Sequence, residues 1–316
     1  MFGPVLHVIR YRRADLPSLI DAINASGYGL TLGIHSRIDE TIAFISRRAH
    51  VGNIYVNRNI VGAVVGVQPF GGEGRSGTGP KAGGPLYLKR LQREALASAS
   101  GTLPWASGVL QAENAGCNKR SAWHRTRSPS EQRLADEGLD ALLDWARMHG
   151  QQRVCVLTEA YMRTTLLGST LTLPGPTGEQ NTLAFAARGA ILCAAADSGV
   201  LLNQLAAVLA TGNRALVLAR PESAMPAGLP TDVKKRIEWV ASLDACKDEF
   251  QIALVEASLA ASLRMPLAAR SGALVSLIET SEVSLIPLWR LLAERALCVN
   301  TTAAGGNASL MTLVGH

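Results

Sequence analysis

The stretch that decides how this sequence is interpreted is residues 70–87, FGGEGRSGTGPKAGGPLY. It holds seven glycines and two prolines among eighteen residues, and it follows an apolar run that ends at Pro69. Glycine is needed where a side chain would forbid the backbone angles or a close approach, so this density excludes the interior of a helix or strand. Flexible linkers rarely place Phe, Arg, Lys and Tyr between their glycines. We therefore predict an ordered loop of the kind that usually carries function.

Length and composition are those of an ordinary globular protein. The 316 residues suffice for about two domains, and 47% apolar with 18% charged residues allow a buried core. No apolar run of eighteen residues and no basic segment before an apolar core occur, so neither a membrane span nor a secretory signal is predicted. Five cysteines without a CxxC pair favour reduced thiols and a cytoplasmic location. Six scattered histidines give no metal-ligand spacing.

The net charge of +6 is distributed unevenly along the chain. Residues 1–130 hold 16 Lys and Arg against 7 Asp and Glu, whereas residues 131–316 hold 15 against 18. A basic patch can contact nucleic acid or an anionic membrane. Because aromatic residues are sparse there and no nucleic-acid motif is present, we expect a solvated basic segment and no nucleic-acid partner.

The first part of the chain predicts a short parallel sheet. Strands are expected at residues 5–11, 30–35 and 53–57, with amphipathic helices at residues 15–26 and 39–50. Short strand–helix–strand connections give parallel strands with crossover helices. After residue 95 the sequence becomes small and polar and then basic, so residues 96–130 are interpreted as a linker.

Residues 131–316 predict a second α/β unit with a doubly wound, Rossmann-like sheet. The expected helices are residues 131–149, 198–210, 233–243 and 257–263, and the expected strands are residues 153–157, 190–194, 214–218, 250–255 and 273–277. No GxGxxG motif follows any of these strands. Residues 175–179, GPTGE, look suited to phosphate, but proline lacks an amide donor, so a structural turn is the better interpretation.

Several stretches together resemble the aldehyde dehydrogenase superfamily. Residues 52–57, 68–72 and 76–79, which read GNIYVN, QPFGG and SGTG, are similar to the closing segment of its catalytic domain. Residues 173–182 and 299–311 resemble the C-terminal extension of the bacterial proline utilization family, whose members join a proline dehydrogenase to a glutamate-semialdehyde (pyrroline-5-carboxylate) dehydrogenase. The resemblance implies an α/β, aldehyde-dehydrogenase-like fold. Residues 1–95 would be part of the catalytic domain, and residues 131–316 a degenerate aldehyde-dehydrogenase-like domain with a tail at 299–316.

The resemblance implies that the chain carries only part of a reaction centre. In the family, the cysteine nucleophile, the general-base glutamate and the main NAD-binding domain lie upstream of the matched segment. None of the five cysteines here matches the nucleophile, so we predict that the chain alone is inactive. NAD would be the cofactor of the complete enzyme. FAD would bind the upstream proline dehydrogenase module and not this chain.

The resemblance also assigns site residues. Gly62 and Ala63 match positions whose backbone amides receive the substrate α-carboxylate, which small residues allow to approach. Phe70 matches a residue that packs on the aliphatic part of the semialdehyde, although composition alone would make it a core aromatic. Phe2 matches a residue at the nicotinamide end of the active site. Asn57 is expected to pin loop backbone rather than contact substrate.

Two functional hypotheses are favoured from the sequence, because the missing phosphate motif and the missing nucleophile count against a third, an independent oxidoreductase that uses the sheet of the second unit. In the first, the chain is the C-terminal part of a bifunctional enzyme that oxidises proline and then L-glutamate γ-semialdehyde. It would supply the substrate loop and a channel-closing tail, with the missing N-terminal part and further copies in a homo-oligomer as its partners. That enzyme would be cytoplasmic, with a peripheral position at the inner membrane face as an option. In the second, the chain is a non-catalytic scaffold or accessory protein that docks on a dehydrogenase in trans.

Overall fold

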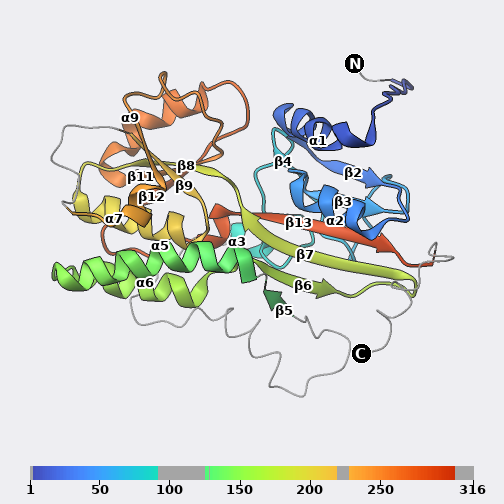
Figure 1. Cartoon of the computed structure of the whole chain (residues 1–316). Coiled ribbons are helices and arrows are strands. Elements are labelled where there is room, and N and C mark those ends of the chain that lie inside the picture. Colours follow the sequence, from blue (N-terminus) through green and yellow to red (C-terminus); the bar gives the residue numbers. More distant parts are fainter. Residues whose placement is uncertain (1–2, 92–124, 128, 219–227, 303–316) are drawn as a thin grey trace.

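The fold contains two large sheets that lie side by side (Figure 1) and a third sheet of only two short strands. It is known from a computed structural model, which describes residues 3–91, 125–127, 129–218 and 228–302. Phe2, most of the predicted linker at 96–130 and all of the tail beyond residue 302 lie outside the described residues. Within the described ranges, no helix combines the length and the apolar character that crossing a membrane requires.

The larger sheet has six strands and mixed directions. In spatial order they are β2 (Thr31–Ile34), β3 (Asn53–Val56), β13 (Leu292–Asn300), β7 (Glu179–Ala187), β6 (Ser169–Leu173) and β5 (Arg125–Arg127). Strands β2, β3 and β13 are parallel, whereas the pairs β13–β7, β7–β6 and β6–β5 are antiparallel. The β3–β13 pair joins the two ends of the sequence, so both predicted units contribute to one sheet. The division of the chain at 96–130 stays a prediction.

The helices of the first unit lie where the sequence predicts them. Helices α1 (Leu16–Ala25) and α2 (Asp39–Arg48) pack beside β2 and β3. Their apolar residues meet the strands in a small core that includes Ile20, Ile34 and Ile54. Three shorter elements also belong to this unit: the 3-10 turn η1 (Arg13–Asp15), and the two-residue strands β1 (Tyr28–Gly29) and β4 (Glu73–Gly74), which pair with each other.

The strand predicted at residues 5–11 is wrong for this structure. The segment contains no regular element, and its apolar side chains are exposed, with Leu6 at 87% and Val8 at 77%. An extended segment becomes a strand only when a neighbour accepts and donates its backbone hydrogen bonds. No strand lies beside residues 5–11 in the described part of the chain, so the alternating pattern is left without a partner.

The smaller sheet has five parallel strands. Their spatial order is β10 (Ile237–Val240), β9 (Arg214–Leu218), β8 (Ala190–Ala194), β11 (Ile252–Glu256) and β12 (Ser276–Thr280). Numbered along the chain, this order is 3-2-1-4-5, which is that of a doubly wound sheet with its switch point between β8 and β11. The predicted doubly wound fold is confirmed for this unit.

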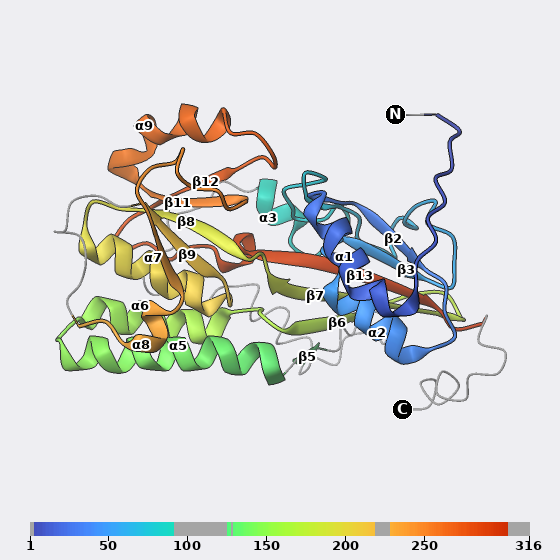
Figure 2. The same cartoon turned by 45° about the horizontal axis from the view of Figure 1, so that its top comes forward.

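Helices cover both faces of the smaller sheet, as the views from two sides show (Figure 2). Helices α5 (Pro129–Met148), α6 (Gln152–Thr164) and α7 (Ser198–Ala210) pack on one face, and α9 (Ala257–Ala268) packs on the other. Strand β8 divides its side chains accordingly. Ile191 and Cys193 join the core beneath α7, whereas Ala190, Leu192 and Ala194 join the core beneath α9. A run of apolar residues is therefore needed, because both faces of this parallel sheet are buried.

Two elements predicted in the second unit are of the wrong type. Residues 153–157, predicted as a strand, belong to helix α6, because Val154, Leu157 and Tyr161 are buried at helical spacing. The helix predicted at 233–243 is instead the four-residue helix α8 (Thr231–Lys234) followed by strand β10. That strand pairs with β9, so sheet pairing outweighs local helical preference.

The remaining differences concern strand position and long strands that local pattern does not reveal. The strand predicted at 273–277 lies three residues later, as β12. Strands β6, β7 and β13 were not predicted, although β6 and β7 form a hairpin. The GPTGE segment is the connection of that hairpin, with Gly178 at a φ of 86°, so its interpretation as a structural turn is confirmed.

Candidate functional site

The loop that follows β3 presents a pair of backbone amides without hydrogen-bond partners. Gly62 and Ala63 are half-buried, and neither N–H donates a hydrogen bond within the described part of the chain. The next amide, that of Val64, is satisfied by Gln68 Oε1 at 3.0 Å. Gly62 has a φ of 148°, and a Cβ there would meet nothing within 4 Å. The loop thus offers two free donors beside open space, which suits a small anion such as a carboxylate.

Phe70 lies on the same loop, at its glycine-rich end. Its backbone exchanges two hydrogen bonds of 2.9 Å with Ala82, and these close the glycine-rich turn. The residue is half-buried, which is less burial than a core aromatic would have. The structure therefore places three predicted substrate residues, Gly62, Ala63 and Phe70, on one loop.

Asn57 fixes the point where this loop leaves the sheet. Its side chain accepts a hydrogen bond from Ser36 N–H and donates one to Ser36 C=O, both at 3.0 Å. Its backbone has a φ of 55°, a left-handed conformation that asparagine tolerates. The prediction that Asn57 pins loop backbone is confirmed.

Buried charged groups hold the glycine-rich end of the loop. Lys81 is 2% exposed, and its ammonium donates to Gly71 C=O and to Asn53 Oδ1. Its backbone N–H donates to a carboxylate oxygen of Glu294 at 2.7 Å. Burial lowers the pKa of Lys81 to about 8 and raises the pKa of Glu294. Because Glu294 lies on β13, 213 residues further along the chain, the loop depends on a distant strand.

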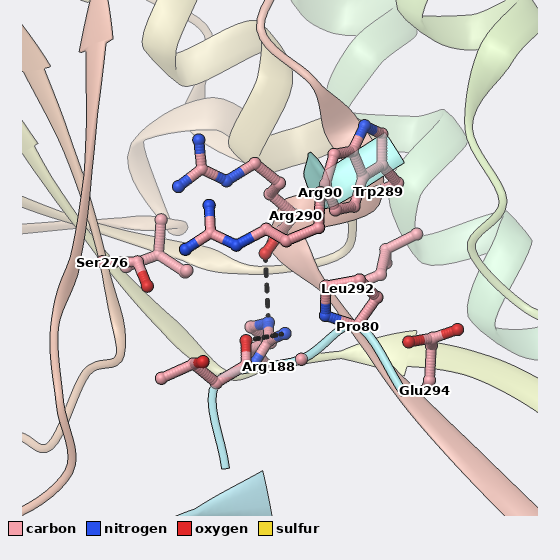
Figure 3. Close-up of a pocket in the computed structure, with 11 residues that line it drawn as sticks. Pro80, Arg90, Arg188, Ser276, Trp289, Arg290, Leu292 and Glu294 are labelled. Carbon is pink, nitrogen blue, oxygen red and sulfur yellow. Dashed lines mark hydrogen bonds between the residues drawn. The ribbon is translucent and has the colours of Figure 1, made fainter. Parts of the chain in front are cut away.

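The half-buried Arg188 ties the loop to both sheets. It donates to Thr78 C=O at 3.3 Å, to Gln251 Oε1 at 2.9 Å and to Arg290 C=O at 3.1 Å. Figure 3 shows Arg188 between the loop and the chain before β13, in a small pocket that Arg90 and Arg290 also line. All three acceptors are neutral oxygens, so these hydrogen bonds fix the geometry of the loop without pairing charges.

The four cysteines within the described residues are all buried. Cys155, Cys193, Cys246 and Cys298 are free and buried, and Cys117 lies outside the described residues. Cys298 is nearest to the loop, with its sulfur 3.0 Å from Arg58 Nη1, and burial raises its pKa. A raised pKa reduces the thiolate fraction on which nucleophilic attack depends.

The switch point of the smaller sheet is where a doubly wound fold binds a dinucleotide, on the amides before the first helix. Here those amides are already bound by the chain itself. Glu256, at the end of β11, accepts hydrogen bonds from Ala196 N–H at 2.7 Å and Asp197 N–H at 2.9 Å. The Asp197 side chain caps α7 through Val200 N–H at 3.0 Å. Two carboxylates thus stand where a diphosphate would bind, and the residues at this edge do not fit NAD.

Comparison with known proteins matches the first part of the chain to a protein family. Residues 1–94 match the aldehyde dehydrogenase family. Gly62, Ala63 and Phe70 lie within the residues that match this family.

The same comparison identifies particular relatives over nearly the whole chain. Over 99% of its length, the chain is 45% identical to Bifunctional protein PutA from Escherichia coli (strain K12) and 43% identical to that from Rhizobium meliloti. It spans only 23% and 24% of the length of these proteins. The chain is thus homologous to the C-terminal part of PutA. The 1-pyrroline-5-carboxylate dehydrogenase of Geobacillus thermodenitrificans is 44% identical over 88 residues, which is 28% of this chain and 17% of that protein.

A solved structure supports the fold. Proline utilization A (PutA) from Corynebacterium freiburgense matches with a TM-score of 0.53 at 20% identity, over 90% of this chain and 24% of that one. The aldehyde-dehydrogenase-like α/β fold class is confirmed.

Sequence reasoning missed the residues that hold the loop from outside it. Glu179, Arg188 and Glu294 all lie more than 100 residues away from their partners in the loop. No local motif signals such contacts. The resemblance of residues 173–182 to a family extension drew attention to the right segment but gave Glu179 no role.

Proposed function

We propose that this chain supplies the substrate-carboxylate loop of an NAD-dependent L-glutamate γ-semialdehyde dehydrogenase, within a bifunctional enzyme that converts proline to glutamate. The observation that carries the proposal is the unpartnered amide pair of Gly62 and Ala63 beside open space. The α-carboxylate of the semialdehyde would accept both hydrogen bonds, and Phe70 would pack on its aliphatic carbons. The similarity to PutA and to 1-pyrroline-5-carboxylate dehydrogenases supports this choice of substrate.

The N-terminal part of the same enzyme is the first proposed partner. Exposed apolar side chains gather on residues 5–11 and 60–65, with Ile9 at 75% and Val65 at 97% exposure. Strand β2 lies at the edge of the larger sheet, where its unpaired backbone groups invite a further strand. Exposed apolar side chains that form a patch mark a protein interface. The N-terminal part would cover it and would provide the partner strand that residues 5–11 lack.

The cofactors are assigned to other parts of the enzyme. NAD would bind the N-terminal part, with Phe2, which lies outside the described residues, at its nicotinamide end. The smaller sheet would be a structural copy, because Glu256 fills its phosphate position. FAD would bind the proline dehydrogenase module and not this chain. A channel-closing role for residues 299–316, a homo-oligomer, a cytoplasmic location and a peripheral position at the inner membrane face also remain proposals.

The test is NADH formation from L-glutamate γ-semialdehyde, followed by absorbance. The complete protein that contains this chain should form NADH, and the purified 316-residue chain should form none. A complete protein without semialdehyde-dependent NADH formation would refute the proposed activity. NADH formation by the chain alone would refute its assignment as a partial site.

The exposed apolar surface also favours the second hypothesis, a scaffold that docks on a dehydrogenase in trans. Mixing the purified chain with a separately purified glutamate-semialdehyde dehydrogenase separates the two. Co-elution in size-exclusion chromatography with raised activity would support docking in trans. Independent elution with unchanged activity would leave the covalent arrangement as the explanation of that surface.

A further inference from the structure

Both ends of the loop segment that carries the amide pair bind the same carboxylate. Gly62 and Ala63 lie between Arg58 and Gln68 in the sequence. Arg58 Nη1 donates to Glu179 Oε1 at 2.5 Å, and Gln68 Nε2 donates to Glu179 Oε2 at 3.1 Å. Glu179 therefore joins the two stems of the segment, although it lies 121 and 111 residues from them along the chain.

Gln68 connects Glu179 directly to the amide pair. While its Nε2 faces Glu179, its Oε1 accepts the hydrogen bond from Val64 N–H at 3.0 Å. Val64 follows Ala63, so its peptide plane fixes the backbone on one side of the free donors. A continuous path of two hydrogen bonds thus runs from the Glu179 carboxylate to the backbone next to Ala63.

The environment makes this connection rigid. Gln68 is 7% exposed, and the side chains of Arg58 and Glu179 are 14% and 16% exposed. Water therefore competes weakly for these hydrogen bonds, and charge-assisted bonds in such places are strong. Glu179 is itself held, because Asn181 Nδ2 donates to its Oε2 at 3.3 Å and it begins strand β7. A carboxylate fixed to the sheet can set the spacing of a loop that has no regular structure of its own.

We propose that Glu179 is a positioning residue that determines specificity for aldehydes with an α-carboxylate, because it holds the Gly62 and Ala63 amides at the spacing such a group requires. This inference rests on the proposed function. Glu179 touches neither substrate nor cofactor in this arrangement and acts through Arg58 and Gln68. Its effect is therefore confined to substrates that use the amide pair.

The test compares two aldehydes in the complete protein that contains this chain. L-Glutamate γ-semialdehyde carries the α-carboxylate, whereas butanal has the same aldehyde chain without the α-carboxylate and α-amino groups. For Glu179→Ala, kcat/KM for the semialdehyde should fall on the order of 30-fold, mainly through KM, as expected for the loss of hydrogen bonds to a charged group. The kcat/KM for butanal and the KM for NAD should stay within about twofold.

Two further variants calibrate this effect. Glu179→Gln keeps one acceptor but turns an amide donor toward Arg58 or Gln68, so its loss should be intermediate. Glu279→Ala is the matched control, because Glu279 also pairs with an arginine, Arg264 at 2.9 Å, but lies on the smaller sheet. It should leave both aldehydes unaffected.

The outcomes separate this inference from the proposed function. An equal loss for both aldehydes, or no loss for the semialdehyde, would overturn the role of Glu179. If the unaltered protein does not oxidise the semialdehyde, the proposed function fails, and hydrogen exchange then decides the positioning. The hydrogen-bonded amides of Val64, Val67 and Gln68 should exchange at least about tenfold faster in Glu179→Ala than in Glu279→Ala, since exchange of a bonded amide reports local opening. Equal exchange in the two variants would overturn the inference without reference to activity.

Discussion

Two pairs of backbone amides in this molecule differ in whether the protein provides their hydrogen-bond acceptor. At the switch point of the smaller sheet, the amides of Ala196 and Asp197 bind the carboxylate of Glu256. In the loop after β3, the amides of Gly62 and Ala63 bind nothing in the described part of the chain. Both positions suit an anion by geometry. The difference is whether the protein supplies the anion itself.

The comparison separates retention of a fold from retention of a site. The smaller sheet keeps the 3-2-1-4-5 strand order of a doubly wound fold, but one acidic side chain at the end of β11 fills its phosphate position. The loop has little regular structure, yet distant side chains hold it open. Three of these, Glu179, Arg188 and Glu294, come from the second half of the chain. That half thus supports the loop.

The largest effect is expected when a bulky side chain blocks the free amides of Gly62 and Ala63. In the complete protein, Gly62→Trp should lower kcat/KM for L-glutamate γ-semialdehyde on the order of a thousandfold, because two hydrogen bonds to a carboxylate are lost. KM should rise more than kcat falls, since these bonds form in the ground state as well. Steady-state kinetics measure this, and unchanged constants would remove Gly62 from the site. The left-handed φ of Gly62 adds strain to any substitution, so circular dichroism should first establish that the variant is folded.

A smaller effect is expected from the buried lysine that supports the loop. The pKa of Lys81 falls to about 8 in the folded state because of burial. Between that pH and its unfolded pKa of 10.5, the unfolded chain keeps a proton that the folded chain has lost. The free energy of unfolding should therefore rise with pH through this window, by roughly 3 kcal/mol at most. In Lys81→Met this part of the rise should disappear.

Urea unfolding at several pH values between 7 and 10.5 measures this difference. Lys89→Met is the control, because burial also lowers the pKa of Lys89 to about 8 but Lys89 lies on α3 (Tyr87–Leu91), beyond the loop. Each variant should lose only the pH-dependent part of the free energy of unfolding that its own lysine contributes. Parallel pH curves for Lys81→Met and the unaltered protein would show that the Lys81 ammonium is not held in a buried site.

The smallest effect is expected when the Ala196 and Asp197 amides lose their acceptor, Glu256. Glu256→Ala should lower the free energy of unfolding by about 1 kcal/mol, as for the loss of a helix cap. The freed amides should then take up inorganic phosphate, so phosphate should raise the melting temperature of this variant more than that of Glu279→Ala. An equal rise in both variants would mean that Glu256 does not stand in for an anion. Binding of NAD by the smaller sheet of the unaltered chain would contradict the statement that Glu256 occupies its phosphate position.

Local pattern predicts those parts of the fold in which each element carries its own signal. The apolar run of β8 and helix α7, which ends at Ala210, could be predicted without information from distant residues. Residues 153–157 have a strand-like composition but complete a helix, and residues 5–11 have a strand pattern without a neighbour. Strands β7 and β13 pair along their whole lengths, yet more than 100 residues separate them in sequence. Such pairing cannot be predicted from periodicity.

The candidate site also contains residues that the sequence predicts and residues that it does not. Gly62, Ala63 and Phe70 could be assigned because the glycine-rich motif around them is continuous in sequence and resembles a known family. The residues that position them could not, because Glu179 and Glu294 look like ordinary surface carboxylates until the sheet brings them to the loop. Their burial is a property of the fold, and no short motif encodes it.

The central claim is that the amides of Gly62 and Ala63 receive the substrate carboxylate. A crystal structure of the complete protein with L-glutamate, the reaction product, tests it most directly. We predict that the α-carboxylate lies within hydrogen-bond distance of both N–H groups while Glu256 still occupies the switch point. A carboxylate bound elsewhere, with Gly62 and Ala63 bonded to protein atoms, would contradict the claim.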